Sequence, residues 1–566
     1  MFGEIASYRH FDEGKASSNP VGKPWLAHGH SLRLPVSAVT LRAVLKDQNQ
    51  ESRMSGYVPN PPKNYRYEEA KPVDIHAERW AEYEKYGKEP AREPEKIGIA
   101  LRNGVFFDGT GNNANNSAAG LLCGAQHPIA PEDIPASCQP YMSDPDSSYG
   151  NDVSNVKKLS DLYGATRLAE GEGPRKKAFG MVYVEGIGTR SGEEDSKFGA
   201  GTGRGETGVA GRVQSSFAVI EQRITEVLDK NPGSEIVSLT FDTFGFSRGA
   251  AAARHFANEI VRGRQGPLGE ILRNQSDALS STFVDQYHSD INMGFIGLFD
   301  TVPSIAGWSN LGNIKSAVAT GIKLYLDRRY FTDVVQLAAR DECRANFALN
   351  RVAMDHPEIV LPGVHSDVGG GYLEEAEECV LISPMQTLEV GNYADINTTS
   401  IYRDAVNVRN QWLADGWPSE MLEVVTPPPL LMPISPQDRL SPRVKRVYAA
   451  VQLKRPVSGL LSRVSLRVMH QLAKAKGVRF EDIPETPDFA VPEELQPMCA
   501  RFAAGDYSTT PEEEHILKLK YIHTSANWNH PLGRRDGSGI RAVYINAPTE
   551  DAIRVKHPHV PDWTLW

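Results

Sequence analysis

The sequence predicts an α/β protein whose core is a mostly parallel sheet with flanking helices. Between about residues 97 and 372, apolar runs of strand length alternate with helix-like segments and glycine-rich loops, which is typical of βα units. Several runs are apolar throughout, as a sheet covered on both faces requires. Five strands are expected here, at 97–107, 179–184, 236–244, 294–299 and 359–364.

One helix between these strands is clearly marked. Val213, Phe217, Ile220 and Ile224 recur at three- and four-residue spacing, which predicts an amphipathic helix. The pair Pro232-Gly233 ends it just before the strand at 236–244.

At 566 residues the chain is too long for one core. We expect a polar N-terminal arm or appendage over residues 1–95, with one short helix at 76–86, and a catalytic domain over 96–380. A C-terminal helical or cap region, 381–566, is expected to contact lipid or a partner. Its basic amphipathic stretch at 460–476 fits an anionic membrane surface, although such helices more often pack on their own domain.

Composition excludes some classes of function and location. A net charge of −10 gives no field that would attract nucleic acid. Five widely spaced cysteines without a CxxC pair indicate neither a disulfide framework nor a zinc site, which fits a reducing cytoplasm. The N-terminus has no signal-peptide core, and no run of about 18 apolar residues could span a bilayer.

The segment 245–249 reads Gly-Phe-Ser-Arg-Gly and follows an apolar strand. An alanine-rich helix begins directly after it, so Ser247 lies on the turn between strand and helix, as in a nucleophile elbow. Glycines are needed there because side chains would collide as the turn closes. This motif predicts an α/β-hydrolase-like fold with Ser247 as the nucleophile.

A serine nucleophile needs a histidine base and a carboxylate to orient that base. Asp300 and His365 each follow a predicted strand, and the order Ser247, Asp300, His365 is that of the α/β-hydrolases. We therefore expect these three as the catalytic triad. Rival acids are Asp242 and Asp367, and rival bases are His523 and His530.

An oxyanion hole needs two backbone N–H groups. Arg248, directly after the nucleophile, is expected to supply one. Gly109, in the glycine-rich loop after the first strand, is expected to supply the other.

Several motifs together resemble the DUF2235 domain of the Tle1-like phospholipase effectors of bacterial type VI secretion systems. The resemblance covers about residues 97–375 and rests on the segments 107–112, 184–189, 245–249, 299–302 and 363–372. It implies an α/β-hydrolase fold with a Ser-Asp-His triad at Ser247, Asp300 and His365, and no cofactor.

The resemblance also implies a biological setting. Such proteins hydrolyse acyl esters of membrane glycerophospholipids in a competing bacterium, and an immunity protein guards the producer. The implied partners are the membrane phospholipid, that immunity protein and a secretion spike or adaptor protein, with no nucleic acid. The chain would be cytoplasmic in the producer and would be secreted into the periplasm of the target cell.

Three alternatives stay open. Asp108, Asp300, His365 and Asp367 could bind a divalent metal in a phosphoesterase. The pattern GxGxxG at 203–208 could hold a dinucleotide, although no clear strand precedes it. The chain could also be a non-enzymatic binding module on a hydrolase scaffold.

Overall fold

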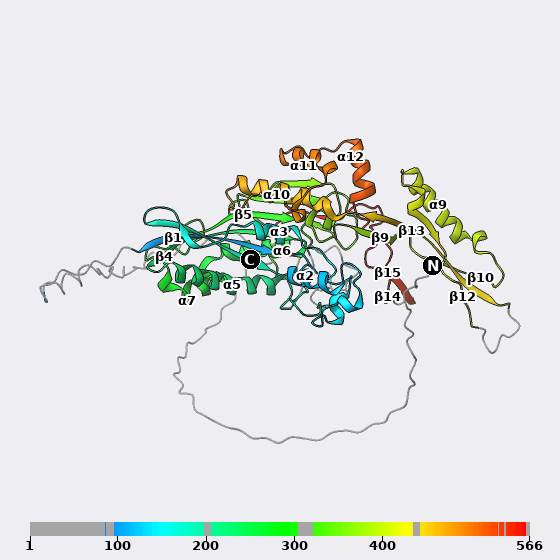
Figure 1. Ribbon diagram of the computed structural model, residues 1–566, viewed down its shortest axis with the longest axis horizontal. Helices are drawn as coiled ribbons and strands as arrows, with labels where there is room; N and C mark the ends of the chain where they lie inside the picture. Colours follow the sequence, from blue (N-terminus) through cyan, green and yellow to red (C-terminus); the bar gives the residue numbers. More distant parts are fainter. Residues whose placement is uncertain are drawn as a thin grey trace, which may run out of the picture. The chain divides into compact units, whose positions relative to one another are not determined.

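Figure 1 shows the computed structural model of the chain, in which the described residues are Lys85, 96–196, 205–303, 321–433, 442–529, 531–536 and 539–561. The chain divides into two units, Met1–Ala91 and Arg92–Trp566. The expected N-terminal arm, with its helix at 76–86, lies outside the described residues. The exception is Lys85, which is helical.

The centre of the second unit is a seven-stranded sheet in the order β2-β3-β1-β4-β5-β6-β8. All neighbours in it are parallel except β2 and β3. The expectation of a mostly parallel sheet in an α/β protein is therefore confirmed. The strands are β1 (Ile97–Phe107), β2 (Thr166–Glu170), β3 (Arg175–Val184), β4 (Ser234–Phe246), β5 (Ile291–Phe299), β6 (Val334–Ala339) and β8 (Glu358–Leu361). Strands β2 and β6 lie outside the five ranges expected from the sequence.

Helices cover both faces of this sheet (Figure 1). On one face, α5 (Val209–Lys230), α6 (Arg248–Val261) and α7 (Leu268–Asn274) share a core with the strands. On the other, α3 (Asn155–Leu162), α10 (Ser462–Ala475) and α11 (Gln496–Ala503) form a second core. The apolar stripe of α10 is buried there, so this helix packs on its own domain and leaves little of that stripe for a membrane.

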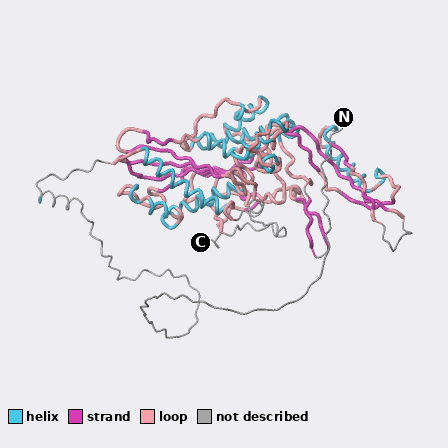
Figure 2. The backbone as a smooth tube through the Cα atoms, turned by 60° about the horizontal axis from the view of Figure 1, so that its bottom comes forward, coloured by secondary structure: helices cyan, strands magenta, loops and turns pink. Residues whose placement is uncertain are grey.

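A smaller antiparallel sheet forms around the long strand β13 (Val444–Val457). Its first half pairs with β10 (Gln386–Gly391) and β12 (Leu430–Leu431), and its second half pairs with β9 (Ala376–Leu381) and β11 (Leu422–Val425). Helix α9 (Ser400–Ala414) packs against this sheet, and α12 (Pro511–Ile516) follows later in the chain. The expected C-terminal cap region thus contains strands as well as helices (Figure 2).

The last described segment returns to the central domain. After the hairpin of β14 (Pro531–Asp536) and β15 (Gly539–Tyr544), the short strand β16 (Lys556–His557) pairs in parallel with β7 (Leu349–Asn350). Two further helices, α2 (Ala114–Cys123) and α8 (His365–Gly369), complete the α-helical elements of the described part. None of its helices has the length and apolar character of a membrane span.

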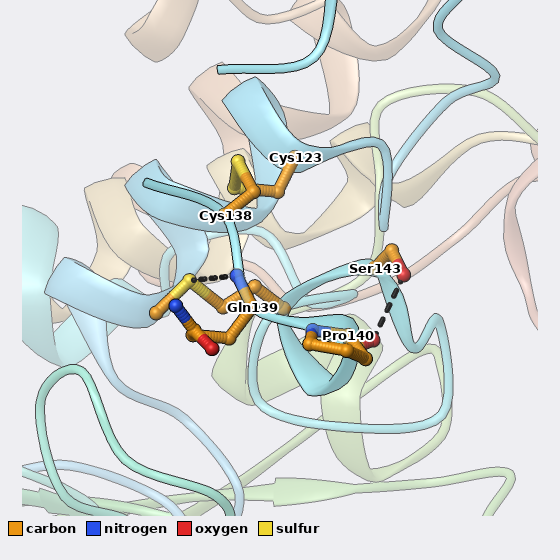
Figure 3. The surroundings of a disulfide bond; sticks show 6 residues. Cys123, Cys138, Gln139, Pro140 and Ser143 are labelled. Atoms are coloured by element: carbon orange, nitrogen blue, oxygen red, sulfur yellow. Dashed lines mark hydrogen bonds between the residues drawn. A yellow bond between two sulfur atoms is a disulfide. The ribbon is translucent and has the colours of Figure 1, made fainter. Parts of the chain in front are cut away.

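Cys123, the last residue of α2, forms a disulfide with Cys138, with the two Cα atoms 5.7 Å apart (Figure 3). The interpretation of the cysteines as unpaired is wrong for these two. The other three cysteines, Cys343, Cys379 and Cys499, are free. An odd number of cysteines therefore gave no indication of this single pair. The bond joins the end of α2 to the loop just before the 3-10 turn at Pro140–Ser143.

Removing this disulfide is expected to destabilise the domain. The bond closes a loop with a sequence separation of 15 residues, for which the chain-entropy model gives about 3 kcal/mol. We expect a reductant to lower the urea midpoint of the wild-type chain, measured by circular dichroism.

The double variant Cys123→Ala with Cys138→Ala is the matched control. It should start at the lower midpoint and show no response to the reductant. Equal midpoints for oxidised and reduced wild type would show that the two thiols are not paired in solution.

Candidate active site

Ser247 lies at a sharp turn between β4, which ends at Phe246, and α6, which begins at Arg248. Its backbone has φ 58° and ψ −123°, a region that non-glycine residues rarely adopt and that marks functional sites. A Cβ at Gly249 would collide with the carbonyl oxygens of Phe107 and Asp108. The sequence therefore places glycine where β1, the turn and α6 come closest.

Asp300 follows β5 and is fully buried. Its backbone φ is 46°, again in the left-handed region. The Oδ1 atom accepts hydrogen bonds from the backbone N–H of Ala339 at 2.9 Å and from Arg554 at 2.6 Å. The Oδ2 atom accepts from Arg554 at 2.8 Å and lies 2.5 Å from Nδ1 of His365. Both oxygens of this carboxylate are thus held by protein donors.

His365 begins α8, shortly after β8, and its buried ring contacts two aromatic rings. The ring centroid of Phe246 is 4.6 Å away, and that of Phe347 is 4.9 Å away. Because Nδ1 faces Asp300, the other ring nitrogen, Nε2, is the one left for a reacting group.

Backbone hydrogen bonds hold Ser247 at the end of β5, next to Asp300. Its N–H donates to the carbonyl of Phe299 at 3.0 Å, and its carbonyl accepts from Val302 at 3.4 Å. The three predicted triad residues thus lie at the carboxyl ends of β4, β5 and β8. The structure records no hydrogen bond between the Ser247 hydroxyl and the His365 ring, both of which it describes; in free enzymes such bonds often tighten only with substrate.

The charges in this cluster are set by burial and by two cations. Burial raises the pKa of Asp300, but Arg554 and His365 outweigh it and hold that pKa well below its usual range. Burial lowers the pKa of His365; Asp300 opposes this, while Arg344 and Arg554 add to it, and the net pKa lies below 6.5. The histidine is therefore neutral at neutral pH, as a general base must be.

The two predicted oxyanion donors are the backbone N–H groups of Arg248 and Gly109. Arg248 is the first residue of α6, directly after Ser247. The N–H of Gly109 donates to its neighbour Asp108 at 2.7 Å, whose carboxylate also accepts from Ser154 at 2.5 Å and Tyr183 at 2.6 Å. The oxyanion role of Gly109 stays a prediction, and it requires this N–H to turn away from Asp108.

The rival acids and bases have other partners. Asp242 binds Arg102 through two hydrogen bonds of 2.7 Å inside the sheet. Asp367 accepts from His523 at 2.7 Å, and the His523 ring stacks on Tyr372 at 3.7 Å. The remaining rival, His530, lies outside the described residues.

The four ligands of the metal alternative do not form a common cation site. The carboxylates of Asp108, Asp300 and Asp367 are each bound by protein donors, and a guanidinium occupies both oxygens of Asp300. Within the described ranges, no group of three or more His, Cys, Asp or Glu side chains is arranged to hold an ion. Positions 203 and 204 of the GxGxxG alternative lie outside those ranges.

Sequence reasoning missed three charged residues around His365. Arg554 binds Asp300, and Glu342 lies behind the histidine, accepting its backbone N–H at 3.3 Å. Burial raises the pKa of Glu342, but its pairing with Arg344 at 2.7 Å lowers that pKa to about 2. None of the three ends a long apolar strand, so no local pattern in the sequence marks them.

Comparison with known proteins supports the resemblance. Residues 262–389 match the family model of the Tle1-like phospholipase effector catalytic domain of type VI secretion systems. A solved structure described as the Tle1 effector bound to the VgrG spike is 28% identical and covers 82% of this chain and 95% of that chain, with a TM-score of 0.63. The resemblance to Tle1-like phospholipase effectors is confirmed.

The segment matched by the Tle1-like model contains Asp300 and His365 but begins after Ser247. A second solved structure, of an uncharacterized protein from Pseudomonas aeruginosa, is 19% identical and covers 74% of this chain and 52% of that chain, with a TM-score of 0.33. No curated protein matches the chain. The Tle1-like comparison is thus the one that bears on function.

The charge state of His365 gives a testable expectation. Because burial, Arg344 and Arg554 lower its pKa, the ring should titrate below pH 6.5. Histidine-labelled full-length protein, followed by NMR across pH 4 to 8, should show this titration, with His365→Gln identifying the resonance. A midpoint above 6.5 would mean that Asp300 outweighs burial and that the ring is charged near neutral pH.

Proposed function

We propose that the chain is a serine phospholipase with an α/β-hydrolase-type active site, in which Ser247, Asp300 and His365 form the catalytic triad. The observation that carries this is the 2.5 Å contact between Asp300 and His365 at the sheet edge where the strained turn holds Ser247. The Tle1-like catalytic domain match supports an acyl ester of a membrane glycerophospholipid as substrate.

The proposed reaction has two halves. His365 Nε2 takes the proton of Ser247 Oγ while that oxygen attacks the acyl carbonyl carbon. The backbone N–H groups of Arg248 and Gly109 hold the resulting oxyanion. His365 then gives its proton to the glycerol oxygen, and the lysophospholipid leaves.

Water completes the second half in the same way. His365 takes its proton, the hydroxide attacks the acyl-enzyme carbonyl, and the fatty acid leaves as Ser247 recovers its proton. Asp300 keeps the ring in the tautomer with hydrogen on Nδ1 and stabilises its charged form. Its lowered pKa keeps it ionised throughout.

Substitution of the nucleophile tests the triad. We expect Ser247→Ala to lower the rate of fatty-acid release from mixed phosphatidylethanolamine and phosphatidylglycerol vesicles by about 10⁴-fold or more. The exposed Ser215 on α5 provides the matched control, since Ser215→Ala should release fatty acid at the wild-type rate.

A chelator separates the metal alternative. Release by the wild type should continue unchanged in its presence. Release that survives Ser247→Ala, or that stops when the chelator is added, would contradict the proposed triad and favour the metal-dependent phosphoesterase.

We also propose that a type VI spike protein carries this chain as an antibacterial effector into the target periplasm, and that an immunity protein protects the producer. The support is the solved relative, a Tle1 effector bound to the VgrG spike. The VgrG-type protein of the same organism should copurify with the full chain, and Ser247→Ala should copurify equally well because carriage needs no catalysis. Failure of both to bind would contradict this mode of delivery.

A further inference from the structure

Arg554 places a cation inside the candidate active site from near the end of the described chain. Arg554 is buried, with 6% of its surface exposed. The two terminal nitrogens of its guanidinium donate to the two carboxylate oxygens of Asp300, at 2.6 and 2.8 Å. Its Nε donates to the carbonyl of Phe347 at 2.7 Å. A planar guanidinium matches a carboxylate in this two-point manner, which the ammonium of lysine cannot do.

The segment that carries Arg554 is fixed by backbone hydrogen bonds next to Asp300. The N–H of Leu349 donates to Val555 at 2.9 Å, and the N–H of Arg351 donates to His557 at 3.0 Å. Between them, the N–H of Asn350 donates to Thr301, the residue after Asp300, at 2.9 Å. The strand pair β7 and β16 therefore sets the position of Arg554 relative to Asp300.

Asp300 needs this cation because its carboxylate is fully buried. A neutral His365 and one backbone N–H leave the negative charge uncompensated, and such a charge in a protein interior takes up a proton instead. Without Arg554, the buried Asp300 and His365 pair would hold a proton to a higher pH. At neutral pH the base would then already be protonated.

Other charged groups around His365 must be counted as well. Glu342 and Arg344 lie behind it on the loop after β6, where they pair with each other at 2.7 Å. Asp367, on the same helix as His365, binds His523 at 2.7 Å. Glu342 and Arg344 compensate each other's charge, and Arg554 is the cation that binds the triad acid directly.

We propose that Arg554 is a positioning residue of the catalytic centre, which orients the Asp300 carboxylate toward His365 and keeps that base free of its proton at neutral pH. The C-terminal segment around β16 is accordingly part of the active site. This inference rests on the proposed triad function.

Arg554→Met tests the proposal, with Arg554→Lys as the conservative variant. We expect Arg554→Met to lower kcat for fatty-acid release about 10- to 100-fold, the loss typical when the partner that orients a metal-binding histidine or carboxylate is removed, with KM nearly unchanged. The acid limb of the kcat/KM profile should move to higher pH. Arg554→Lys keeps the charge without the fork and should return the acid limb toward the wild type while restoring only part of kcat.

Arg351→Met is the matched control. Arg351 is also bound to β16 through its backbone, but its side chain pairs with Glu358 at 2.8 Å and is partly exposed. It should keep the wild-type pH profile. Thermal unfolding of each variant shows the folded fraction, so a fall in kcat that follows unfolding alone, with the acid limb unmoved, would overturn the proposal.

The NMR titration of His365 needs no lipid hydrolysis and separates the two hypotheses. A higher titration midpoint in Arg554→Met supports the role of Arg554 even if Ser247→Ala retains activity, in which case only the proposed function fails. Loss of activity in Ser247→Ala together with an unchanged His365 midpoint in folded Arg554→Met would leave the triad standing and refute the inference.

Discussion

The negative charge of Asp300 lies where water does not reach, and the surrounding structure is arranged to make that charge stable. Breaking a buried ion pair by removing one partner typically costs about 3–5 kcal/mol. Here the partner comes from 254 residues further along the chain. The charge is thus stable only when the central sheet and the C-terminal segment are assembled together. The protonation state of His365, the proposed base, therefore depends on the complete fold.

A second constraint is steric and lies at Ser247. The left-handed backbone of this residue is strained, and the strain persists because β1, β4 and α6 approach so closely that glycine alone fits at position 249. Hydrogen bonds to Phe299 and Val302 fix the turn against the end of β5. The same end of β5 carries Asp300, so one strand terminus positions both the proposed nucleophile and the proposed acid.

Much of this arrangement follows from local sequence. Strands β1, β4 and β5 were predictable because their apolar runs are of strand length and lie between turn-forming residues, and parallel strands bring their carboxyl ends to one edge. That rule is why Ser247, Asp300 and His365 could be grouped from the sequence alone. Strand β6 escaped prediction because a run of six residues interrupted by Gln336 does not distinguish strand from helix.

What could not be predicted depends on distant pairing. The position of Arg554 is decided by the β7 and β16 contact, whose two-residue strands carry no periodicity. The disulfide between Cys123 and Cys138 was missed for a different reason, since it spans only 15 residues but an odd cysteine count gives no sign of a single pair. For α10 the sequence pattern fits a membrane surface as well as the more common packing on its own domain, and the sheet face that needs covering decides between them.

These long-range contacts bear on where the catalytic unit ends. A boundary near residue 380 includes Ser247, Asp300 and His365, yet it leaves out α10 and α11, which cover one face of the sheet, and Arg554, which balances the acid. A chain cut there would expose the apolar residues of β4 and β5 that these helices bury and would leave Asp300 without its cation. The chemistry proposed for three strand ends therefore depends on the assembled domain from β1 to β16, since Arg554, which we propose keeps the triad in its working charge state, comes from outside the segment that contains these three residues.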